Sequence, residues 1–100
     1  MTNDSRTVSD SMEETKVRHE RYLRAINSPI RREILRSIHQ GNKTLYKLSN
    51  ALGLEAKTLE WHLNMLIYGY CIEKKNTDEG ILFEITQEGL VVDFMDKNNF

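Results

Sequence analysis

The sequence predicts a mainly α-helical domain that carries one β-hairpin, an α+β fold. Three observations lead to this prediction. Apolar residues recur at helical spacing in consecutive segments at residues 29–39, 45–52 and 58–66. Two β-prone runs follow, and a polar loop that contains glycine separates them. Further helical patterns flank this core, at residues 13–27 and after Thr86. We therefore expect helices at both ends of the domain.

The first helix of the predicted core covers residues 29–39. Its apolar face consists of Ile30, Ile34, Leu35 and Ile38. Ser28 is placed to cap the N-terminus, Pro29 suits the first helical position, and Gly41 follows the predicted end.

Residues 44–66 contain two short amphipathic helices separated by a turn at Gly53. The two apolar stripes are Leu45, Leu48 and Leu52 in the first helix, and Leu59, Leu63 and Leu66 in the second. Two short helices joined by such a turn are typical of a helix-turn-helix. Because the leucines face the core, the second helix should expose Lys57, Thr58, Glu60, Trp61 and Asn64.

A β-hairpin is predicted downstream, from a first strand at residues 70–75 and a second at residues 81–85. The polar residues 76–80 form the predicted loop between them. Three helices, a hairpin and a closing helix follow one another in the order of a winged helix.

The chain resembles the winged helix-turn-helix transcriptional regulators of the ArsR-like group, which include many small archaeal members. The matching segments are SPIRREIL at residues 28–35, TLYKLSNALGL at 44–54, TLEWHLNML at 58–66 and ITQEG at 85–89. The resemblance implies a dimeric regulator of duplex DNA with extra N-terminal and C-terminal helices. It also implies that the helix at residues 58–66 enters the major groove and that the hairpin is the wing.

One hundred residues are enough for one small domain. We predict a disordered polar tail over residues 1–12 and a winged helix-turn-helix domain over residues 13–100. The sequence contains no apolar run of membrane-spanning length and no apolar signal core near its start, so we expect a cytoplasmic protein. The single cysteine, Cys71, lies where a buried strand residue is expected.

The net charge of −1 conceals a polarised chain. Residues 1–15 carry one basic and four acidic residues, and residues 76–100 carry one basic and six acidic residues. Between them, residues 16–75 carry twelve Lys or Arg against five Asp or Glu. This positive segment coincides with the helices and the first wing strand. Such a distribution favours contact with phosphates, although ordinary solvated helix faces are the alternative.

The predicted DNA contacts form two groups. The candidates on the basic segment are Arg31, Arg32, Lys43, Lys47, Lys57, Lys74 and Lys75, with Thr44 beside them. By resemblance, the groove-facing residues are Lys57, Thr58, Glu60, Trp61 and Asn64. Asn64 suits adenine, Lys57 suits a phosphate or guanine, and Glu60 can accept from cytosine. Related regulators often have serine at the positions of Glu55 and Glu60, so this chain is more acidic there.

The sequence offers no pattern for catalysis or metal binding. It contains no Gly-rich phosphate loop and no nucleophile motif. There is no Cys-x-Cys pair, and the three histidines are not spaced as ligands. We expect His62 to pack and bond locally. We therefore predict that the protein is not an enzyme and that it has no metal and no cofactor.

The terminal helices predict self-association. The stripe in the first helix includes Tyr22, Leu23 and Ile26, and that of the last helix consists of Leu90, Val91, Phe94 and Met95. By resemblance these residues form a two-fold interface, which would suit a palindromic operator. The alternative is that each helix packs back on its own domain.

A second functional reading comes from another class of protein. The acidic residues on the third helix and at the wing tip would also suit a winged-helix module that binds a partner protein without strong DNA binding. Salt-dependent binding to duplex DNA distinguishes the two readings.

Overall fold

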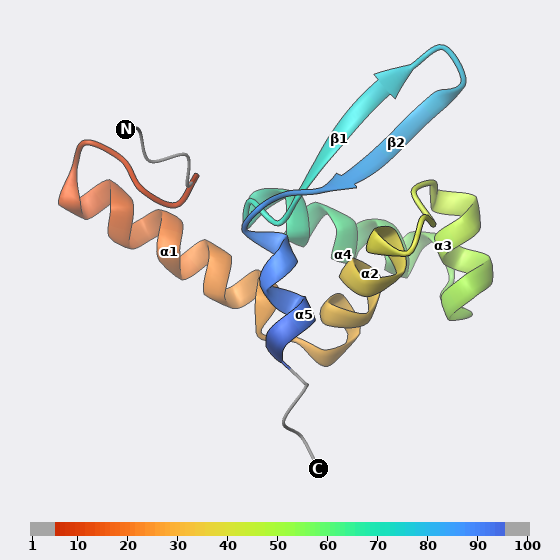
Figure 1. The fold of residues 1–100 in the computed structure, drawn as a ribbon, viewed down its shortest axis with the longest axis horizontal. Helices are drawn as coiled ribbons and strands as arrows, with labels where there is room; N and C mark the ends of the chain where they lie inside the picture. Colours follow the sequence, from red (N-terminus) through yellow and green to blue (C-terminus); the bar gives the residue numbers. More distant parts are fainter. Residues whose placement is uncertain (1–5, 96–100) are drawn as a thin grey trace.

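The computed structural model describes residues 6–95, and its elements follow the predicted order. Within this range they are α1 (Met12–Ile26), α2 (Pro29–His39), α3 (Leu45–Leu52), α4 (Ala56–Tyr68), β1 (Ile72–Thr77), β2 (Gly80–Ile85), the 3-10 turn η1 (Gly89–Val91) and α5 (Val92–Met95). Helices α2, α3 and α4 form the body, α1 extends to one side, and the hairpin projects away from the body (Figure 1). The fold is a winged helix-turn-helix, as the sequence predicts.

Hydroxyl side chains set the starts of α1, α2 and α3. Ser11, Ser28 and Thr44 each accept a hydrogen bond from a backbone N–H three residues further on. Such a cap stabilises a helix by about 1 kcal/mol relative to alanine. Gly53 ends α3 with a φ of 68°, a left-handed conformation that costs glycine little. α4 follows Glu55, whose negative charge favours the positive end of the helix dipole.

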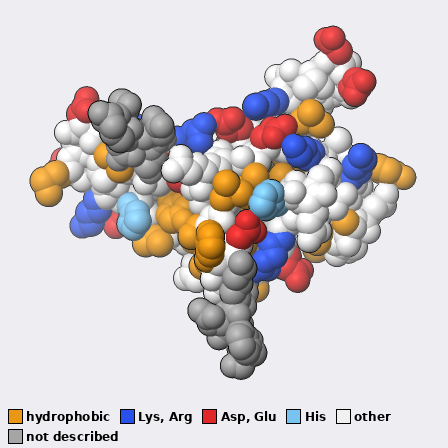
Figure 2. Space-filling view, in the orientation of Figure 1, with side chains coloured by type: hydrophobic (Ala, Val, Ile, Leu, Met, Phe, Trp, Pro, Cys, Tyr) orange, Lys and Arg blue, Asp and Glu red, His pale blue; other side chains and the backbone are white. Residues whose placement is uncertain are grey.

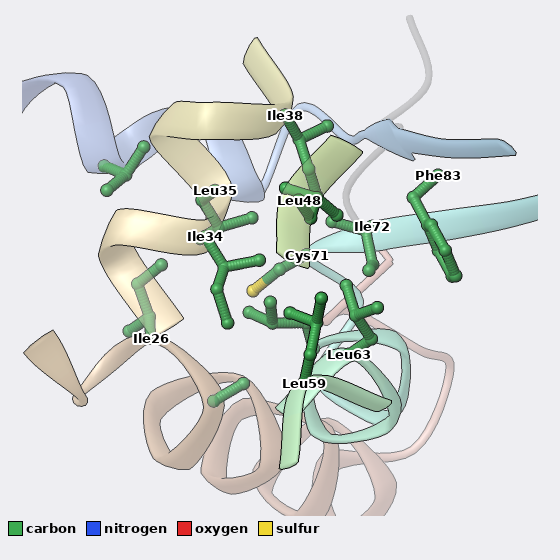
Figure 3. Close-up of a cluster of buried hydrophobic side chains, with 13 residues drawn as sticks. Ile26, Ile34, Leu35, Ile38, Leu48, Leu59, Leu63, Cys71, Ile72 and Phe83 are labelled. Atoms are coloured by element: carbon green, nitrogen blue, oxygen red, sulfur yellow. The ribbon is translucent and has the colours of Figure 1, made fainter. Parts of the chain in front are cut away.

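One apolar core joins the helices to the base of the hairpin (Figure 3). Leu59, Leu63 and Leu66 of α4 are each at most 1 % exposed, as their spacing predicts. They pack with buried residues of α1, α2, α3 and α5 and of both strands. The opposite face of α4 is therefore left at the surface.

Cys71 is fully buried just before β1. Burial, with a smaller contribution from Glu88, raises the pKa of its thiol to about 12. The thiol therefore stays protonated at neutral pH and acts as a small apolar side chain, which confirms the predicted structural role.

A glycine lets α1 approach the end of α4 closely. A β-carbon on Gly69 would lie 2.4 Å from that of Ala25 and 2.8 Å from the carbonyl oxygen of Arg21. The guanidinium of Arg21 lies 3.5 Å from the ring centre of Tyr68, and its Nε donates to the Tyr68 carbonyl at 3.0 Å. These contacts fix α1 against α4.

The hairpin has a tighter turn than predicted. Its strands pair up to Thr77 opposite Gly80, so Asp78 and Glu79 alone form the turn instead of residues 76–80. Gly80 has a φ of 119°, and the Thr77 hydroxyl donates to the Gly80 carbonyl at 2.7 Å. Backbone pairing thus extends through polar residues that a hydrophobic pattern does not mark.

Backbone hydrogen bonds fix the base of the hairpin to the helical body. The N–H of Phe83 donates to the carbonyl of Lys43 at 2.8 Å, and that of Thr86 donates to Cys71 at 2.9 Å. The Phe83 side chain is buried in the core. The base of the wing is therefore held in place while its tip extends into solvent (Figure 1).

The segment after Thr86 differs from the single helix predicted there. It forms η1 first, and α5 begins only at Val92. A β-carbon on Gly89 would lie 2.3 Å from the carbonyl oxygen of Cys71, so the chain passes close to the core before the helix starts. Residues 96–100, at the end of the predicted helix, lie outside the described residues.

The domain start predicted at residue 13 lies one residue after the start of α1. Ahead of this helix, Arg6 contacts Glu73 and Glu88 near the base of the hairpin. Residues 1–5, the first part of the tail for which the sequence predicts disorder, lie outside the described residues. Disorder of the tail stays a prediction.

Candidate nucleic-acid interface

The outward face of α4 carries the five predicted groove-facing residues. All are exposed in the structure: Lys57, Thr58, Glu60, Trp61 and Asn64. Trp61 is 57 % exposed, so it lies at the surface and is not a core residue. The face combines an ammonium, an amide, a hydroxyl, a carboxylate and an aromatic ring. These are the groups that hydrogen-bond to or contact base edges in the major groove.

A cleft of about 280 Å³ lies between α4 and the hairpin. Its lining residues are Leu45, Glu60, Leu63, Asn64, Lys74, Ile81 and Phe83. Lys74 and Lys75 are both exposed on β1. The cleft thus brings predicted residues of the wing beside predicted residues of α4.

Sequence reasoning did not include Ile81 in the site. Ile81 lines the cleft and is 44 % exposed. The alternation of side chains between the two faces of β2 could have indicated the place of Ile81. It shares a strand face with Phe83 but lies further from the body, where the core no longer covers it.

On α3 and the loop before it, the predicted residues differ in how free their side chains are to contact DNA. Lys47 is exposed. The Thr44 hydroxyl accepts from the N–H of Lys47 at 3.1 Å, so its oxygen is already engaged as a helix cap. Lys43 lies 3.3 Å from Glu84 of β2, which partly neutralises its charge.

Arg31 and Arg32 donate hydrogen bonds to the end of α1, a role that the sequence analysis did not predict. Arg31 is 8 % exposed and donates to the carbonyls of Ala25 at 2.9 Å and Arg24 at 3.0 Å. The half-buried Arg32 donates to Ile26 at 3.1 Å. Both arginines therefore satisfy the last carbonyls of α1, where positive charge also suits the helix dipole. Arg31 is buried in this role and is not placed to contact a phosphate, which corrects the prediction for that residue.

His62 forms the local bond that the sequence predicts. Its Nδ1 lies 3.2 Å from a terminal nitrogen of Arg31. A guanidinium only donates, so Nδ1 accepts and the ring is neutral. Burial lowers the pKa of His62, and the charge of Arg31 lowers it further.

The wing carries charges of opposite sign along its length. Asp78 and Glu79 are exposed at the tip, whereas Lys74 and Lys75 lie on β1. Figure 2 shows acidic side chains at the end of the hairpin and basic side chains nearer its base. Lys74 and Lys75 therefore lie between the acidic tip and the paired residues Glu73 and Glu84 at the base of the hairpin.

The predicted dimer residues separate into surface and core. Leu23, Leu90, Phe94 and Met95 are exposed, and Tyr22 and Val91 are half-buried. Ile26 is only 3 % exposed and belongs to the core, which corrects its predicted place in an interface. In Figure 2, apolar side chains gather where α1 meets α5.

Residues 6–95 contain neither a membrane-spanning helix nor a cluster of metal ligands. No helix in this range has the length and hydropathy needed to cross a membrane. Nor do three His, Cys, Asp or Glu side chains of the described part lie together as ligands for a metal ion. The expected lack of a metal stays a prediction.

The helix-turn-helix is similar to a known family of regulators. Residues 28–67 match the model of the bacterial regulatory proteins of the arsR family. This range contains α2, α3 and nearly all of α4. The chain is therefore similar to this family over its helix-turn-helix, and its fold is a winged helix. The match supports a DNA-binding transcriptional regulator.

Solved structures of similar fold extend the likeness beyond the helix-turn-helix. The transcriptional repressor BigR from Xylella fastidiosa has a TM-score of 0.68 and 18 % identity, and the match covers 87 % of this chain and 91 % of BigR. A second solved ArsR family transcriptional regulator has a TM-score of 0.64 and 15 % identity, with coverages of 84 % and 89 %. At these identities the likeness establishes the fold. No curated protein sequence matches this chain significantly.

Proposed function

We propose that the protein is a transcriptional regulator that binds specific sequences in duplex DNA as a homodimer. The observation that carries the proposal is the surface shared by α4 and the wing. There Lys57, Asn64 and Lys74 are all exposed, while the leucines of α4 anchor the helix from behind. The arsR family match over the same helices supports the DNA-binding part.

The exposed face of α4 would read bases in the major groove, which is about 12 Å wide and admits a helix. Asn64 can pair with both hydrogen-bonding groups of an adenine edge. Lys57, in the first turn of α4, can reach a guanine edge or a phosphate. Glu60 repels phosphates but accepts from cytosine, so it favours particular sequences over general affinity.

The wing would contact the DNA backbone through its base. Lys74 lines the cleft beside α4 and Lys75 follows it on the same strand. The tip carries Asp78 and Glu79, so we expect no insertion of a basic side chain into the minor groove. Lys47 on α3 is a further exposed phosphate contact.

Dimerisation would align two such surfaces on a two-fold operator. The exposed apolar side chains of α1 and α5 support this part of the proposal. Leu23 is 47 % exposed, Met95 41 % and Phe94 70 %. Such large apolar side chains gain about 1.5–3 kcal/mol each when they are fully buried.

The experiment that tests the proposal replaces Lys57 with alanine. We expect weaker binding to every duplex sequence and a salt slope smaller by about one, because one phosphate contact is lost. Fluorescence anisotropy of a labelled duplex across a salt series measures both quantities. Lys16→Ala, which removes an exposed lysine from α1, is the matched control and should leave the slope unchanged. Equal slopes for Lys57→Ala and the wild type would remove Lys57 from the interface.

Replacing the acidic residues of the wing tip should strengthen DNA binding, whereas Lys57→Ala should weaken it. The double variant Asp78→Lys, Glu79→Lys should bind non-specific DNA more tightly, because it removes repulsion close to the phosphates. The same charge change placed on Asp10 and Glu13, which are exposed near the start of α1, controls for net charge. The measurement is the affinity for a random-sequence duplex at low salt. Weaker binding by the tip variant would show that the acidic tip makes a favourable contact.

A further inference from the structure

The guanidinium of Arg31 joins three helices. It donates to two carbonyls at the end of α1, through Nε to Ala25 at 2.9 Å and through Nη2 to Arg24 at 3.0 Å. Arg31 itself belongs to the first turn of α2. Its Nη1 donates to Nδ1 of His62, in the middle of α4, at 3.2 Å. The third bond directly connects Arg31 to the helix that carries the proposed base contacts.

This network reaches the proposed DNA surface through Trp61. The rings of Trp61 and His62 meet edge to face with centroids 5.0 Å apart. The guanidinium carbon of Arg31 lies 5.8 Å from the ring centre of Trp61, within the range of a cation–π contact. Trp61 is 57 % exposed on the outward face of α4. A change at the His62–Arg31 bond therefore acts directly on a side chain of the interface.

We propose that Arg31 is a positioning residue for DNA binding, and that its bond to neutral His62 makes the affinity for DNA fall as the pH falls. The inference rests on the proposed function, since it requires that α4 contacts DNA. It adds a pH dependence to that function and assigns it to one histidine.

Protonation of His62 would break the bond for a simple chemical reason. Nδ1 of the imidazolium is a donor, so it would face the Arg31 donor at hydrogen-bonding distance with a second positive charge. Arg31 is already held by α1, so the imidazole ring would turn away and Trp61 would lose its neighbour. Of the described residues, Arg31 is the charged group whose field acts on this ring, and α1 contributes the two carbonyls that Arg31 already occupies.

The direction of the pKa shift of His62 sets the pH range in which the affinity for DNA changes. Burial and then Arg31 lower the pKa of His62 below the ordinary histidine value of about 6.5. The neutral, bonded form is therefore fully present above that value and is lost as the pH falls through the lowered pKa. An additional positive charge would by itself strengthen attraction to DNA. A loss of affinity at low pH is thus opposite to the general electrostatic effect.

The test compares the affinity for one labelled mixed-sequence duplex at about pH 7.5 and about pH 5.5, at constant ionic strength. For the wild type we expect a lower affinity at the lower pH, by up to about fivefold if the pKa of His62 differs by one unit between bound and free protein and lies below about 6.5 in the free protein. His62→Asn keeps an acceptor oxygen in place of Nδ1 but does not titrate, so this fall should disappear. His39→Asn is the matched control. His39 is exposed and pairs with Asp93 on another surface, so this variant should keep the wild-type fall.

Two further readouts separate positioning from folding. Trp61 is the chain's single tryptophan, and a protonated imidazole quenches indole fluorescence. Its emission should titrate with a midpoint below about 6.5 in the wild type and should not titrate in His62→Asn. Arg31→Lys keeps the charge but loses the fork of donors, so it should bind more weakly at the higher pH and lose less affinity on acidification. Far-ultraviolet circular dichroism checks that each variant is helical.

The possible failures are distinguishable. A folded wild type that binds no duplex at either pH overturns the proposed function. Binding that stays constant or tightens at the lower pH overturns only the role of Arg31 and His62. A fall in affinity of the same size in His62→Asn would also overturn the role of Arg31 and His62, because another group would then cause the pH dependence.

Discussion

Replacing Leu63 with alanine is expected to lower the free energy of unfolding by about 2–5 kcal/mol, whereas Asn64→Ala should change it by less than about 0.5 kcal/mol. Leu63 is 1 % exposed and packs in the core, so its truncation leaves a cavity beneath α4. Asn64 is exposed on the other side of the same helix turn. The first loss is a large fraction of the stability of a small domain.

In the recognition of DNA sequence, Asn64→Ala should have a larger effect than Leu63→Ala. At temperatures where both variants are folded, Asn64→Ala should lose discrimination at one base position, at a cost of about 1–3 kcal/mol. Leu63→Ala should retain the preferred base. Urea unfolding followed by circular dichroism, together with competition between duplexes that differ at one position, measures the two effects. Similar losses of stability in both variants would contradict the division of α4 into a buried face and a reading face.

Phe94→Asp is expected to convert the proposed homodimer into a monomer with unchanged helical content. Phe94 is 70 % exposed on α5, and a charge there would oppose burial against a second copy. The affinity for a two-half-site operator should fall by about 10²–10⁴-fold, because the two surfaces would no longer bind as one linked unit.

Sedimentation equilibrium of the wild type and the variant measures this change directly. Tyr46→Asp is the matched control, since Tyr46 is 76 % exposed on α3 rather than on the predicted interface. We expect a dimer for the wild type and for the control. A wild type that sediments as a monomer at high micromolar concentration would contradict the homodimer.

Local sequence patterns predict most of this fold because the signals are themselves local. The leucine spacing of α4 and the cap at Ser28 act within one or two helical turns, and the structure places both as predicted. The hairpin turn was predicted less well. Backbone pairing continues to Thr77 and Gly80, residues that carry no hydrophobic signal.

The candidate site shows where such patterns stop being informative. Arg31 and Lys57 both appear in the sequence as basic residues on amphipathic helices. Only the tight connection between α1 and α2 places Arg31 against the carbonyls of Arg24 and Ala25 and removes it from the surface. Ile26 and Leu23 share one helical stripe, but the packing of α1 buries the first and exposes the second. Burial of this kind depends on tertiary contacts that spacing alone does not specify.

The most direct test of the DNA-binding role is the affinity of the wild-type protein for a mixed-sequence duplex as a function of salt. If Lys47, Lys57, Lys74 and Lys75 each neutralise one phosphate, the logarithm of the binding constant should fall with the logarithm of the salt concentration with a slope of about −4 per protomer. Failure of the folded protein to bind duplex DNA at low salt, or binding that salt leaves unchanged, would contradict the account. Either result would favour a winged-helix module that binds a partner protein.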